Sequence, residues 1–546
     1  MYVNMLNRAF NIVNNFLAQK YSHSELLVLR SELNRIYYSE YKSDEYYDNY
    51  FEIQDLLSTL NERESIRKTK GVYYTPNDVV SFIVTNSFKI LSQNVDYFKL
   101  DNSINFEVNF MEICFSKTVF DPTCGAGEFL IETLDYKYNL LERSIANPSI
   151  AEVHAVLQTI FGNDINPDSI NITKLRIFLY ILERYGIDSI IGISKILSQN
   201  FTVQDYLQQL TVSKESLCER RFDVILGNPP YVEQSKSGLE LERNYGNIYA
   251  HVLEKSSTQL KQNGVIGFII PLSYVSTPRM KSIRETLYKL IPTQVILNFS
   301  DRPDCLFTSV HQKLTIIFGR NTNSTVSIFT GNYTYWYKNE RDFLFQSSEV
   351  IENNFIEEKF IPKLGNNFDV SIYKNIKSQA NALNSLFDGG DKSIYLNMRA
   401  AFWIKAFLNK HKGSEYKIFS SSNVDNINYA MCLFNSSLFW WFWICISDCW
   451  HITQKELNGF RIPINFDTKI VKELANNLEM KLEETKLYVG TKQTEFEYKH
   501  RLCVEEIHKI DDYINQLFGL SEAESDYIKS FAYKYRISGG RNVKNN

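Results

Sequence analysis

The sequence predicts a protein of the α/β class, in which buried parallel strands form an open sheet. Three short apolar runs, within 119–121, 160–164 and 222–227, carry this prediction, because each ends at an acidic or amide residue followed by a turn. The run Val224-Ile225-Leu226 is apolar without alternation, as expected for a strand that is covered on both faces. Ligands of open α/β sheets bind outside the carboxyl ends of the strands, so the candidate site residues should follow these runs.

The composition limits the class of protein. With 546 residues, 44% hydrophobic and 22% charged, the chain is long enough for two or three globular domains. A net charge of −4 neither favours nor excludes a nucleic-acid partner, because one basic face is enough. Eight cysteines without a Cys-x-x-Cys pair predict free thiols and no metal site, in a reducing cytoplasm. No signal peptide is evident, and the apolar run 438–446 is too short to span a bilayer, so we expect no membrane association.

The motif Asn228-Pro229-Pro230-Tyr231 directly follows the third apolar run. Pro229 and Pro230 lack backbone donors and stiffen the loop, so the Asn228 carboxamide, the Pro229 carbonyl and the Tyr231 ring should face outward. Two acceptors aimed at the N–H groups of an exocyclic amine would draw this poor nucleophile toward tetrahedral geometry, and the ring would stack on the base. We interpret the motif as a catalytic corner for methyl transfer to an amino group. The alternative is an ordinary turn, because Asn-Pro and Pro-Pro pairs are common in loops.

The turn 121–127 joins the first apolar run to a helix that begins near Glu128. It lacks the third glycine of a dinucleotide-binding turn, and no lysine follows Gly127 to bind a phosphate. An acidic strand end suits a cationic ligand, and S-adenosylmethionine carries both an ammonium and a sulfonium group. We expect Asp121 to bind the ammonium, with Thr123 beside it, while Gly125 and Gly127 let the ligand approach bare backbone.

Two more acidic strand ends follow in order. Asp164, with Ile165 after it, would accept hydrogen bonds from the two ribose hydroxyls of the same cofactor. Asp205 would contact the adenine amino group. A single aspartate of this kind is more often a turn residue or a helix cap than a ligand, so the order of the three acidic ends, followed by Asn-Pro-Pro-Tyr, carries the interpretation.

A further candidate element precedes the sheet. Tyr74-Thr75-Pro76 begins a helix, with Thr75 expected at the N-cap and Pro76 in the first turn. We expect these residues to form a lid over the carboxylate of the cofactor, because a helix N-terminus offers hydrogen-bond donors.

Together these motifs resemble the gamma class of DNA adenine-N6 methyltransferases of bacterial restriction–modification systems. The resemblance covers residues 71–319 and implies a Rossmann-like S-adenosylmethionine-dependent methyltransferase domain. It implies double-stranded DNA as the substrate and an adenine rotated out of the duplex. We also expect the protein to act as a monomer, and any cognate restriction endonuclease to be a separate polypeptide. The resemblance also implies a second aromatic residue at the base, for which Phe307 is the candidate. One departure is that Asp164 lies further from the glycine turn than in a compact cofactor-binding unit.

The expected domain order is an N-terminal helical segment (1–69), the catalytic domain (70–329), an α+β DNA target-recognition domain (330–465) and a C-terminal helical region (466–546). The first segment lacks Gly and Pro and has helical periodicity. Its Glu40-Tyr41-Lys42 has the form of a nuclease motif without an upstream aspartate, so we expect no nuclease. Candidate phosphate contacts in the target-recognition domain are Lys405, Lys410, Lys412, Lys417, Lys455 and Arg461. The alternative, which is favoured for any single one of them, is a solvated surface charge.

Other activities remain open at the level of sequence. Asn-Pro-Pro-Tyr also suits N4-cytosine methylation, and methylation of RNA or of a protein glutamine. The long chain after Gly319 favours a reader of duplex DNA over a small protein-methylating enzyme. A DNA-binding module with an inactive catalytic domain is disfavoured, because every residue that the chemistry requires is present.

Overall fold

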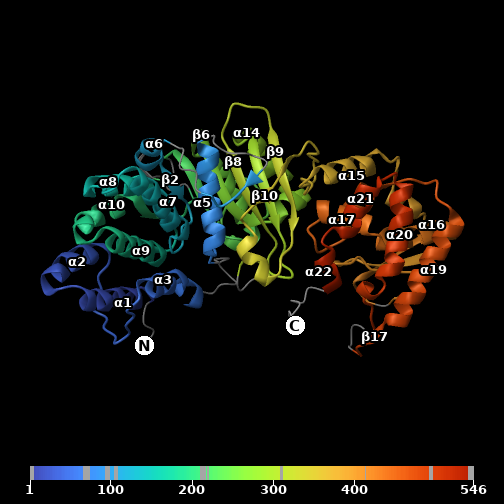
Figure 1. Ribbon diagram of the computed structural model, residues 1–546, viewed down its shortest axis with the longest axis horizontal. Helices are drawn as coiled ribbons and strands as arrows, with labels where there is room; N and C mark the ends of the chain where they lie inside the picture. The colour runs from blue at the N-terminus through green and yellow to red at the C-terminus, as the bar shows by residue number, and fades with distance from the viewer. Residues whose placement is uncertain are drawn as a thin grey trace.

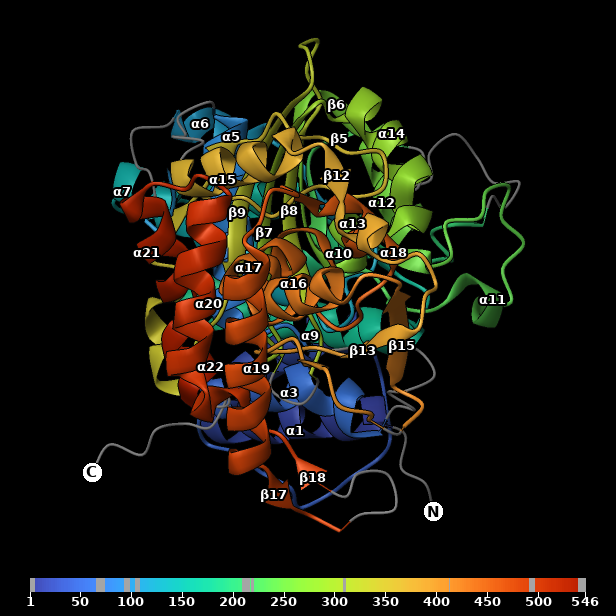
Figure 2. The same cartoon turned by 90° about the vertical axis from the view of Figure 1, so that its right-hand side faces the viewer.

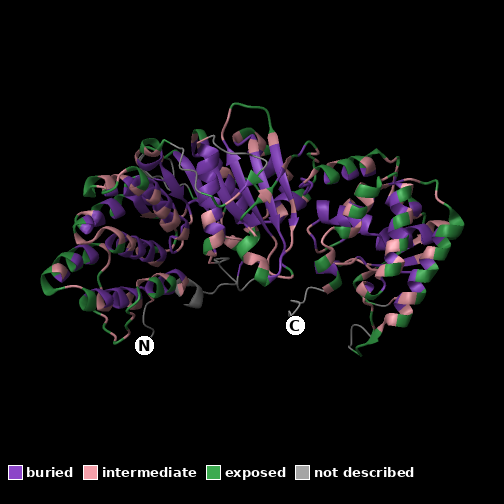
Figure 3. Ribbon diagram, viewed as in Figure 1, coloured by how far each residue is buried: buried purple, intermediate pink, exposed green. Residues whose placement is uncertain are grey.

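The computed structural model describes residues 5–64, 74–92, 99–103, 109–208, 217, 220–307, 311–411, 413–490 and 496–538. Figure 1 shows the N-terminal helices at one end, a large sheet in the middle and a C-terminal helical module at the other end. The side chains of the sheet and of the inner helices are buried, and exposed residues gather on the outer helices (Figure 3).

A mixed sheet of nine strands has the order β11-β9-β7-β8-β6-β5-β2-β3-β4. Strands β4, β3, β2, β5 and β6 are parallel, and β8 runs antiparallel between β6 and β7. The predicted α/β class is therefore confirmed. The strands are β2 (Val119–Asp121), β3 (Ile160–Asp164), β4 (Phe201–Val203), β5 (Phe222–Gly227), β6 (Leu260–Pro271), β7 (Thr293–Phe299), β8 (Leu314–Arg320), β9 (Ser327–Thr334) and β11 (Ile351–Glu352).

The chain order reverses at β2. From β2 the chain continues to β3 and β4 on one side, whereas β5 and β6 lie on the other side. Such a reversal in a parallel sheet opens a crevice at the carboxyl ends of the two central strands. Phe120 pairs with Ile225 across these strands, so the turns that follow β2 and β5 begin side by side.

Helices cover both faces of the sheet. Val224 and Leu226 of β5 belong to one hydrophobic cluster, with helices on that face, whereas Ile225 belongs to the other cluster. This alternation explains the continuous apolar run in the sequence. Helices of the first face are α5 (Asn77–Leu91), α6 (Phe110–Phe115), α7 (Glu128–Ser144), α8 (Ile150–Leu157), α9 (Pro167–Tyr185) and α10 (Ile193–Asn200), and those of the second are α12 (Ile248–Thr258) and α14 (Lys281–Leu290).

The N-terminal segment forms α1 (Met5–Lys20), α2 (His23–Ile36) and α3 (Tyr50–Glu64). Their buried residues belong to the same cluster as α5, α7 and α9. Gln54 of α3 donates a hydrogen bond to the carbonyl of Arg176 on α9 (3.0 Å). The segment is therefore continuous with the core of the sheet domain.

The C-terminal module contains α15 (Asn367–Ser378), α16 (Val424–Asn435), α17 (Ser437–Ile446), α18 (Gln454–Gly459), α19 (Thr468–Thr485), α20 (Val504–Leu517), α21 (Glu522–Ser530) and α22 (Tyr533–Ser538). Its strands are β12 (Asn381–Ala382), β13 (Lys392–Asn397), β14 (Ala406–Phe407), β15 (Tyr416–Ser421) and β16 (Arg461–Ile462). Two further pairs are β1 (Lys99–Leu100) with β10 (Ser348–Glu349), and β17 (Leu487–Tyr488) with β18 (Phe496–Glu497).

Every residue of α17 is buried, including Trp440, Trp441 and Trp443. Figure 2 shows α19 and α20 in front of α16 and α17. Among the residues that the structure describes, no single helix is long and apolar enough to cross a membrane; the bent pair α16 and α17 reaches the required length and composition together. The apolar run in the sequence is the core of this module.

Lys455 was expected to contact phosphate, and the structure contradicts this expectation. Its ammonium donates hydrogen bonds to the carbonyls of Ser276 and Ile446, both at 2.7 Å. Ser276 lies beside the large sheet, and Ile446 is the last residue of α17. Through these two hydrogen bonds, Lys455 links the C-terminal module to the sheet domain. Lys412 lies outside the described residues.

Gly227 fits against Asp121 so closely that we expect the substitution Gly227→Ala to destabilise the protein. Its φ of +153° disfavours a side chain, and a Cβ would lie 2.7 Å from Oδ1 of Asp121. The expected loss in the free energy of unfolding is about 1–3 kcal/mol, measured by urea denaturation.

The matched control is Gly238→Ala, at the end of α11 (Gln234–Ser237). Gly238 also has a positive φ, of 71°, but a Cβ added there would have no atom within 4 Å. Its substitution should cost only the backbone strain, about 1 kcal/mol. Equal losses for the two variants would contradict the proposed packing of Gly227 against Asp121.

Candidate active site

The turn after β2 and the turn after β5 lie side by side at the carboxyl ends of these strands, where α/β sheets of this topology form a ligand crevice. The sequence predicted functional residues in both turns, and the parallel pairing of β2 with β5 places the turns side by side. Gly227 and Asp121 are in close approach at the base of this crevice. The roles assigned to the individual residues remain predictions, but the structure brings the residues together.

Asp121 is a buried carboxylate at the end of β2, with 1% of its surface exposed. Its Oδ1 accepts a hydrogen bond from the backbone N–H of Thr123 (3.0 Å). Burial, and then the nearby charge of Asp164, raise the pKa of Asp121 well above its usual value. A cationic ligand would relieve both effects, because it would stabilise the charged carboxylate.

Two features of the same turn suit a ligand: Thr123 has a hydroxyl without a hydrogen-bond partner among the described residues, and Gly125 has open space beside it. The hydroxyl of Thr123 is buried and has no hydrogen-bond partner among the described residues. A Cβ on Gly125 would meet no atom within 4 Å. The backbone at Gly125 is therefore open to a ligand, as the sequence predicted for a glycine turn.

Asp164, at the end of β3, holds this turn in place. Its Oδ2 accepts from the N–H of Gly125 (2.9 Å), and its Oδ1 accepts from the N–H of Asn166 (2.8 Å). The adjacent Ile165 exposes 67% of its surface. Contact of Asp164 with the ribose stays a prediction, and the structure adds a role in supporting the glycine turn.

Asp205 follows β4 and shapes its own turn. One carboxylate oxygen accepts from the N–H groups of Leu207 (3.0 Å) and Gln208 (3.3 Å). This is the turn function that the sequence left open as the alternative. Its contact with an adenine ring stays a prediction.

Two buried residues of α9 support the glycine turn and were missed in the sequence. Thr173 donates to the carbonyl of Gly125 (2.9 Å), and Arg176 donates to that of Ala126 (2.7 Å). Arg176 also pairs with Glu128 and donates to Gln54 (2.9 Å). The available signal was a hydroxyl and a cation three residues apart in one helix, a spacing that places both side chains on one face.

Thr75 acts differently from the prediction. Helix α5 begins at Asn77 with Pro76 at the N-cap, and no side chain caps it, so the expectation that Thr75 is the N-cap is wrong. Instead, the buried Thr75 hydroxyl accepts a hydrogen bond from the Asn228 amide nitrogen (3.0 Å). This bond fixes the plane of the Asn228 carboxamide.

Tyr74 precedes Thr75 and is half-buried; burial raises its pKa to about 12. Residues 71–73 of the same motif lie outside the part of the chain that the structure describes. Whether Tyr74, Thr75 and Pro76 cover a cofactor carboxylate remains a prediction.

The rings of Tyr231 and Phe307 face each other at the crevice. Their centroids are 6.4 Å apart, and their planes differ by 26°. The Tyr231 hydroxyl donates to the carbonyl of Ile269 on β6 (2.9 Å), which anchors the ring. The structure thus pairs the two aromatic residues that the sequence proposed for one base.

Arg341 anchors the loop that carries Phe307. Its guanidinium donates to the carbonyls of Cys305 and Leu306, both at 3.0 Å, and pairs with Asp78 in the first turn of α5. Arg341 lies in η4 (Lys338–Phe343), beyond the expected boundary at residue 329, which β9 also crosses. Sequence spacing could not reveal this contact, because the two partners are 263 residues apart.

Comparisons with known proteins agree with this geometry. Residues 158–304 match the family described as Eco57I restriction-modification methylase. The modification methylase CviBIII of Paramecium bursaria Chlorella virus NC1A is 32% identical over 164 residues, which are 29% of this chain and 36% of that protein. The adenine-specific methyltransferase PglX of Streptomyces coelicolor is 23% identical over 33% of this chain and 16% of that protein. The matched segments thus span about a third or less of these relatives.

A solved structure of a nuclease-deletion mutant of the Type ISP restriction-modification enzyme LlaGI, in complex with a DNA substrate mimic, is also similar. It covers 87% of this chain and 62% of that chain, at 14% identity and a TM-score of 0.48.

The family match and the α/β sheet together indicate S-adenosylmethionine as the methyl donor. The residues at the crevice fit this group: Asp121 offers a buried carboxylate to its ammonium, Thr123 offers an unused hydroxyl, and Gly125 leaves space. Residues 158–304, which hold the Asn-Pro-Pro-Tyr corner, are thus the part of the chain that matches the Eco57I restriction-modification methylase family.

Proposed function

We propose that the protein is a sequence-specific DNA methyltransferase that transfers a methyl group from S-adenosylmethionine to N6 of an adenine rotated out of the duplex. The observation that carries the proposal is the position of Asn228, whose carboxamide is fixed by Thr75 directly after the strand that packs against Asp121. The corner proposed to hold the target amine and the carboxylate proposed to bind the cofactor, Asp121, therefore lie at the ends of neighbouring strands.

The protein would act mainly through alignment and acceptance of hydrogen bonds. When bound, S-adenosylmethionine supplies a methyl group on a positively charged sulfur. The Asn228 Oδ1 and the Pro229 carbonyl would accept from the two N–H groups of the amine, which localises the nitrogen lone pair. The N–C bond then forms as the C–S bond breaks, and the methylated ammonium loses one proton to water. No strong base is required, and preorganised acceptors supply much of the rate enhancement.

The paired rings of Tyr231 and Phe307 support a flat base as the acceptor. A base taken out of the duplex loses its stacking energy, and aromatic side chains restore part of it. Adenine is favoured over cytosine by the resemblance of the motif, and a relative named as an adenine-specific methyltransferase is consistent with that choice.

Label transfer tests the proposed substrate. We expect tritium from methyl-labelled S-adenosylmethionine to enter duplex DNA, and nucleoside analysis to recover it as N6-methyladenine. The variant Asn228→Ala should lose at least 100-fold in transfer rate, since one preorganised hydrogen-bonding group is worth roughly that factor, while cofactor binding by calorimetry is retained.

Label found only in protein or RNA would contradict DNA as the substrate, and label in N4-methylcytosine would replace adenine as the base. An undiminished rate of methyl transfer by Asn228→Ala would show that Asn228 does not activate the target amine by accepting its hydrogen bond.

Stacking by Tyr231 can be measured once sequencing of modified bases has mapped the target adenine. With 2-aminopurine at that position, wild type should give a rise in fluorescence on binding. We expect Tyr231→Ala to lose most of this rise and to bind DNA about 10-fold more weakly, because stacking of a base on an aromatic ring is worth about 1–3 kcal/mol. Tyr231→Phe keeps the ring and loses the bond to Ile269, so it should behave much like wild type. An unchanged signal for the alanine variant would exclude Tyr231 from base capture.

The raised pKa of Asp121 predicts a pH dependence of cofactor binding. Without ligand, burial favours the protonated carboxyl, whereas the ammonium of the cofactor requires the carboxylate. Affinity should therefore rise with pH until the raised pKa is passed, by up to about 10-fold per pH unit below it, and then level off. Calorimetric titrations from mildly acidic to neutral pH measure this. The variant Asp121→Asn should bind weakly at every pH; a slope that persists in this variant would assign the dependence to another group.

A further inference from the structure

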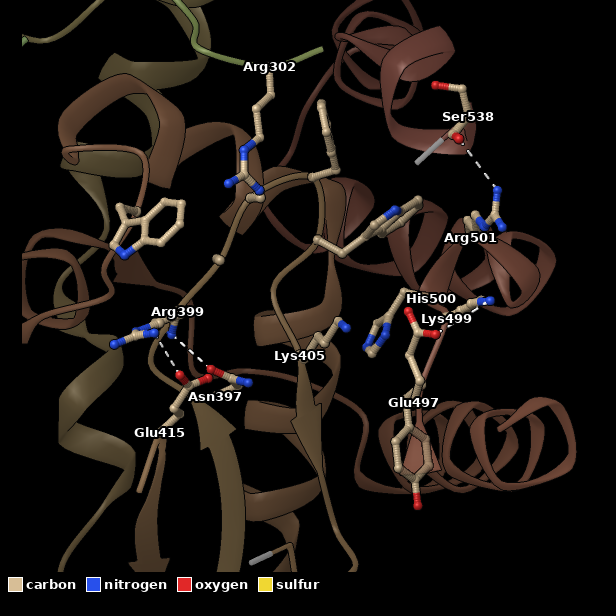
Figure 4. Close-up of a pocket in the computed structure, with 16 residues that line it drawn as sticks. Arg302, Asn397, Arg399, Lys405, Glu415, Glu497, Lys499, His500, Arg501 and Ser538 are labelled. Atoms are coloured by element: carbon tan, nitrogen blue, oxygen red, sulfur yellow. Dashed lines mark hydrogen bonds and ion pairs between the residues drawn. The ribbon is translucent and has the colours of Figure 1, made fainter. Parts of the chain in front are cut away.

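A second pocket lies away from the crevice, where the loop after β7 faces the C-terminal module. Its volume is about 480 Å³, within the usual size range of ligand sites. Figure 4 shows Arg302 from that loop on one side, with Lys405 and His500 next to each other on the module side. The pocket therefore joins the part of the chain that carries Phe307 to the part expected to read DNA.

The charge of this pocket is strongly positive. Two acidic residues line it, and each already has a cation: Glu415 pairs with Arg399 (2.8 Å), and Glu497 pairs with Lys499 (3.5 Å). The other cations that line the pocket are Arg302, Lys405 and Arg501. Arg501 lies 3.5 Å from two backbone carbonyls.

Arg302 and Lys405 form no ion pair with any residue in the described ranges. Arg302 is exposed and lies over the ring of Trp450, with 5.3 Å between the guanidinium carbon and the ring centroid. Lys405 is half-buried, and burial lowers its pKa, an effect that the charge of Glu497 offsets only in part. An ammonium group held away from water without a direct ion pair is costly, and an anionic ligand would offset that cost.

His500 lines the pocket and is almost completely buried. Its Nε2 lies 3.0 Å from Oδ1 of Asn435, an acceptor, so Nε2 carries the proton. Nδ1 is buried without a hydrogen-bond partner among the described residues. Burial, and then the neighbouring Lys405 and Arg536, lower the pKa of His500 well below its usual value. His500 is therefore neutral, and the positive charge of the pocket rests on the lysine and the arginines.

We infer that this pocket binds a backbone phosphate of the DNA, held between Arg302 and Lys405. The inference rests on the proposed function, because it names how the same substrate is held. Arginine and lysine are the side chains that contact nucleic-acid phosphates most often, and such contacts fix the register of the protein on the duplex. Of the lysines that the sequence offered as phosphate contacts, the structure favours Lys405, and it adds Arg302, which the sequence analysis did not select.

The location of Arg302 gives the contact a second consequence. Arg302 is five residues before Phe307, and Arg341 holds the intervening carbonyls of Cys305 and Leu306. A phosphate bound by Arg302 therefore restrains the same short loop that presents Phe307 to Tyr231. This loop therefore links the binding of a DNA phosphate to the position of the Phe307 ring.

The test is the salt dependence of duplex binding by the full chain. A fluorescein-labelled 20-base-pair duplex is titrated with wild type, Arg302→Gln and Lys405→Met at several salt concentrations. Each variant should weaken binding about 5- to 20-fold near 0.1 M salt and reduce the slope of log K against log salt by about 1. The matched control is Lys472→Met on α19, an exposed lysine of the same module that neither lines the pocket nor is a candidate phosphate contact, and it should stay within twofold of wild type.

Because Lys405 is half-buried, thermal unfolding checks that its variant is folded, and exposed Arg302 provides an independent variant. Affinities and slopes of both variants that equal those of Lys472→Met would overturn the inference. Binding of inorganic phosphate or AMP that is lost in Lys405→Met, with duplex binding unchanged, would also overturn it and assign the pocket to a small phosphate ligand. These outcomes are separate from the test of the proposed function. If the wild-type protein binds duplex DNA through the pocket but does not methylate it, the proposed activity is refuted and the phosphate site is retained.

Discussion

The parallel pairing of β2 with β5 is the constraint on which the rest of the molecule depends. The two strands are more than 100 residues apart in the sequence, yet their register places Phe120 beside Ile225 and brings Gly227 against Asp121. The absence of a Cβ at Gly227 permits that approach. A buried carboxylate at the end of one strand and a carboxamide at the end of the next are therefore held close together, as the proposed reaction requires of the groups that align its two substrates.

Neighbouring elements hold these two strand ends rigid. Asp164, Thr173 and Arg176 satisfy backbone groups of the glycine turn. Thr75 fixes the Asn228 carboxamide, and Arg341 fixes the loop before Phe307. The supporting residues come from regions that the sequence separates into different domains. The N-terminal helices contribute Gln54 to the cofactor side, and the chain after residue 329 contributes Arg341 to the base side.

Much of this arrangement could be predicted from local sequence. A continuous apolar run that ends at Asp121, or that precedes Asn228, predicts a strand with a polar candidate site residue at its end, because strand burial and turn chemistry are local properties. Thr173, Arg176 and Arg341 could not be found in this way, because their function arises from contacts with distant turns. The same reason explains the error at Lys455. Its charge predicted a phosphate contact, but only the packed structure shows that two carbonyls already accept its hydrogen bonds. Every residue of the apolar helix α17 is buried, and its packing within α16–α21 explains its composition.

The central claim is that the methyl donor and the Asn-Pro-Pro-Tyr corner occupy one crevice. A crystal structure of the protein with S-adenosylhomocysteine tests it most directly. The account predicts that the amino group of this ligand lies against the Asp121 carboxylate, that its backbone contact is Gly125, and that its sulfur faces the Asn228 carboxamide. Density for the ligand elsewhere, or a sulfur directed away from Asn228, would contradict the account.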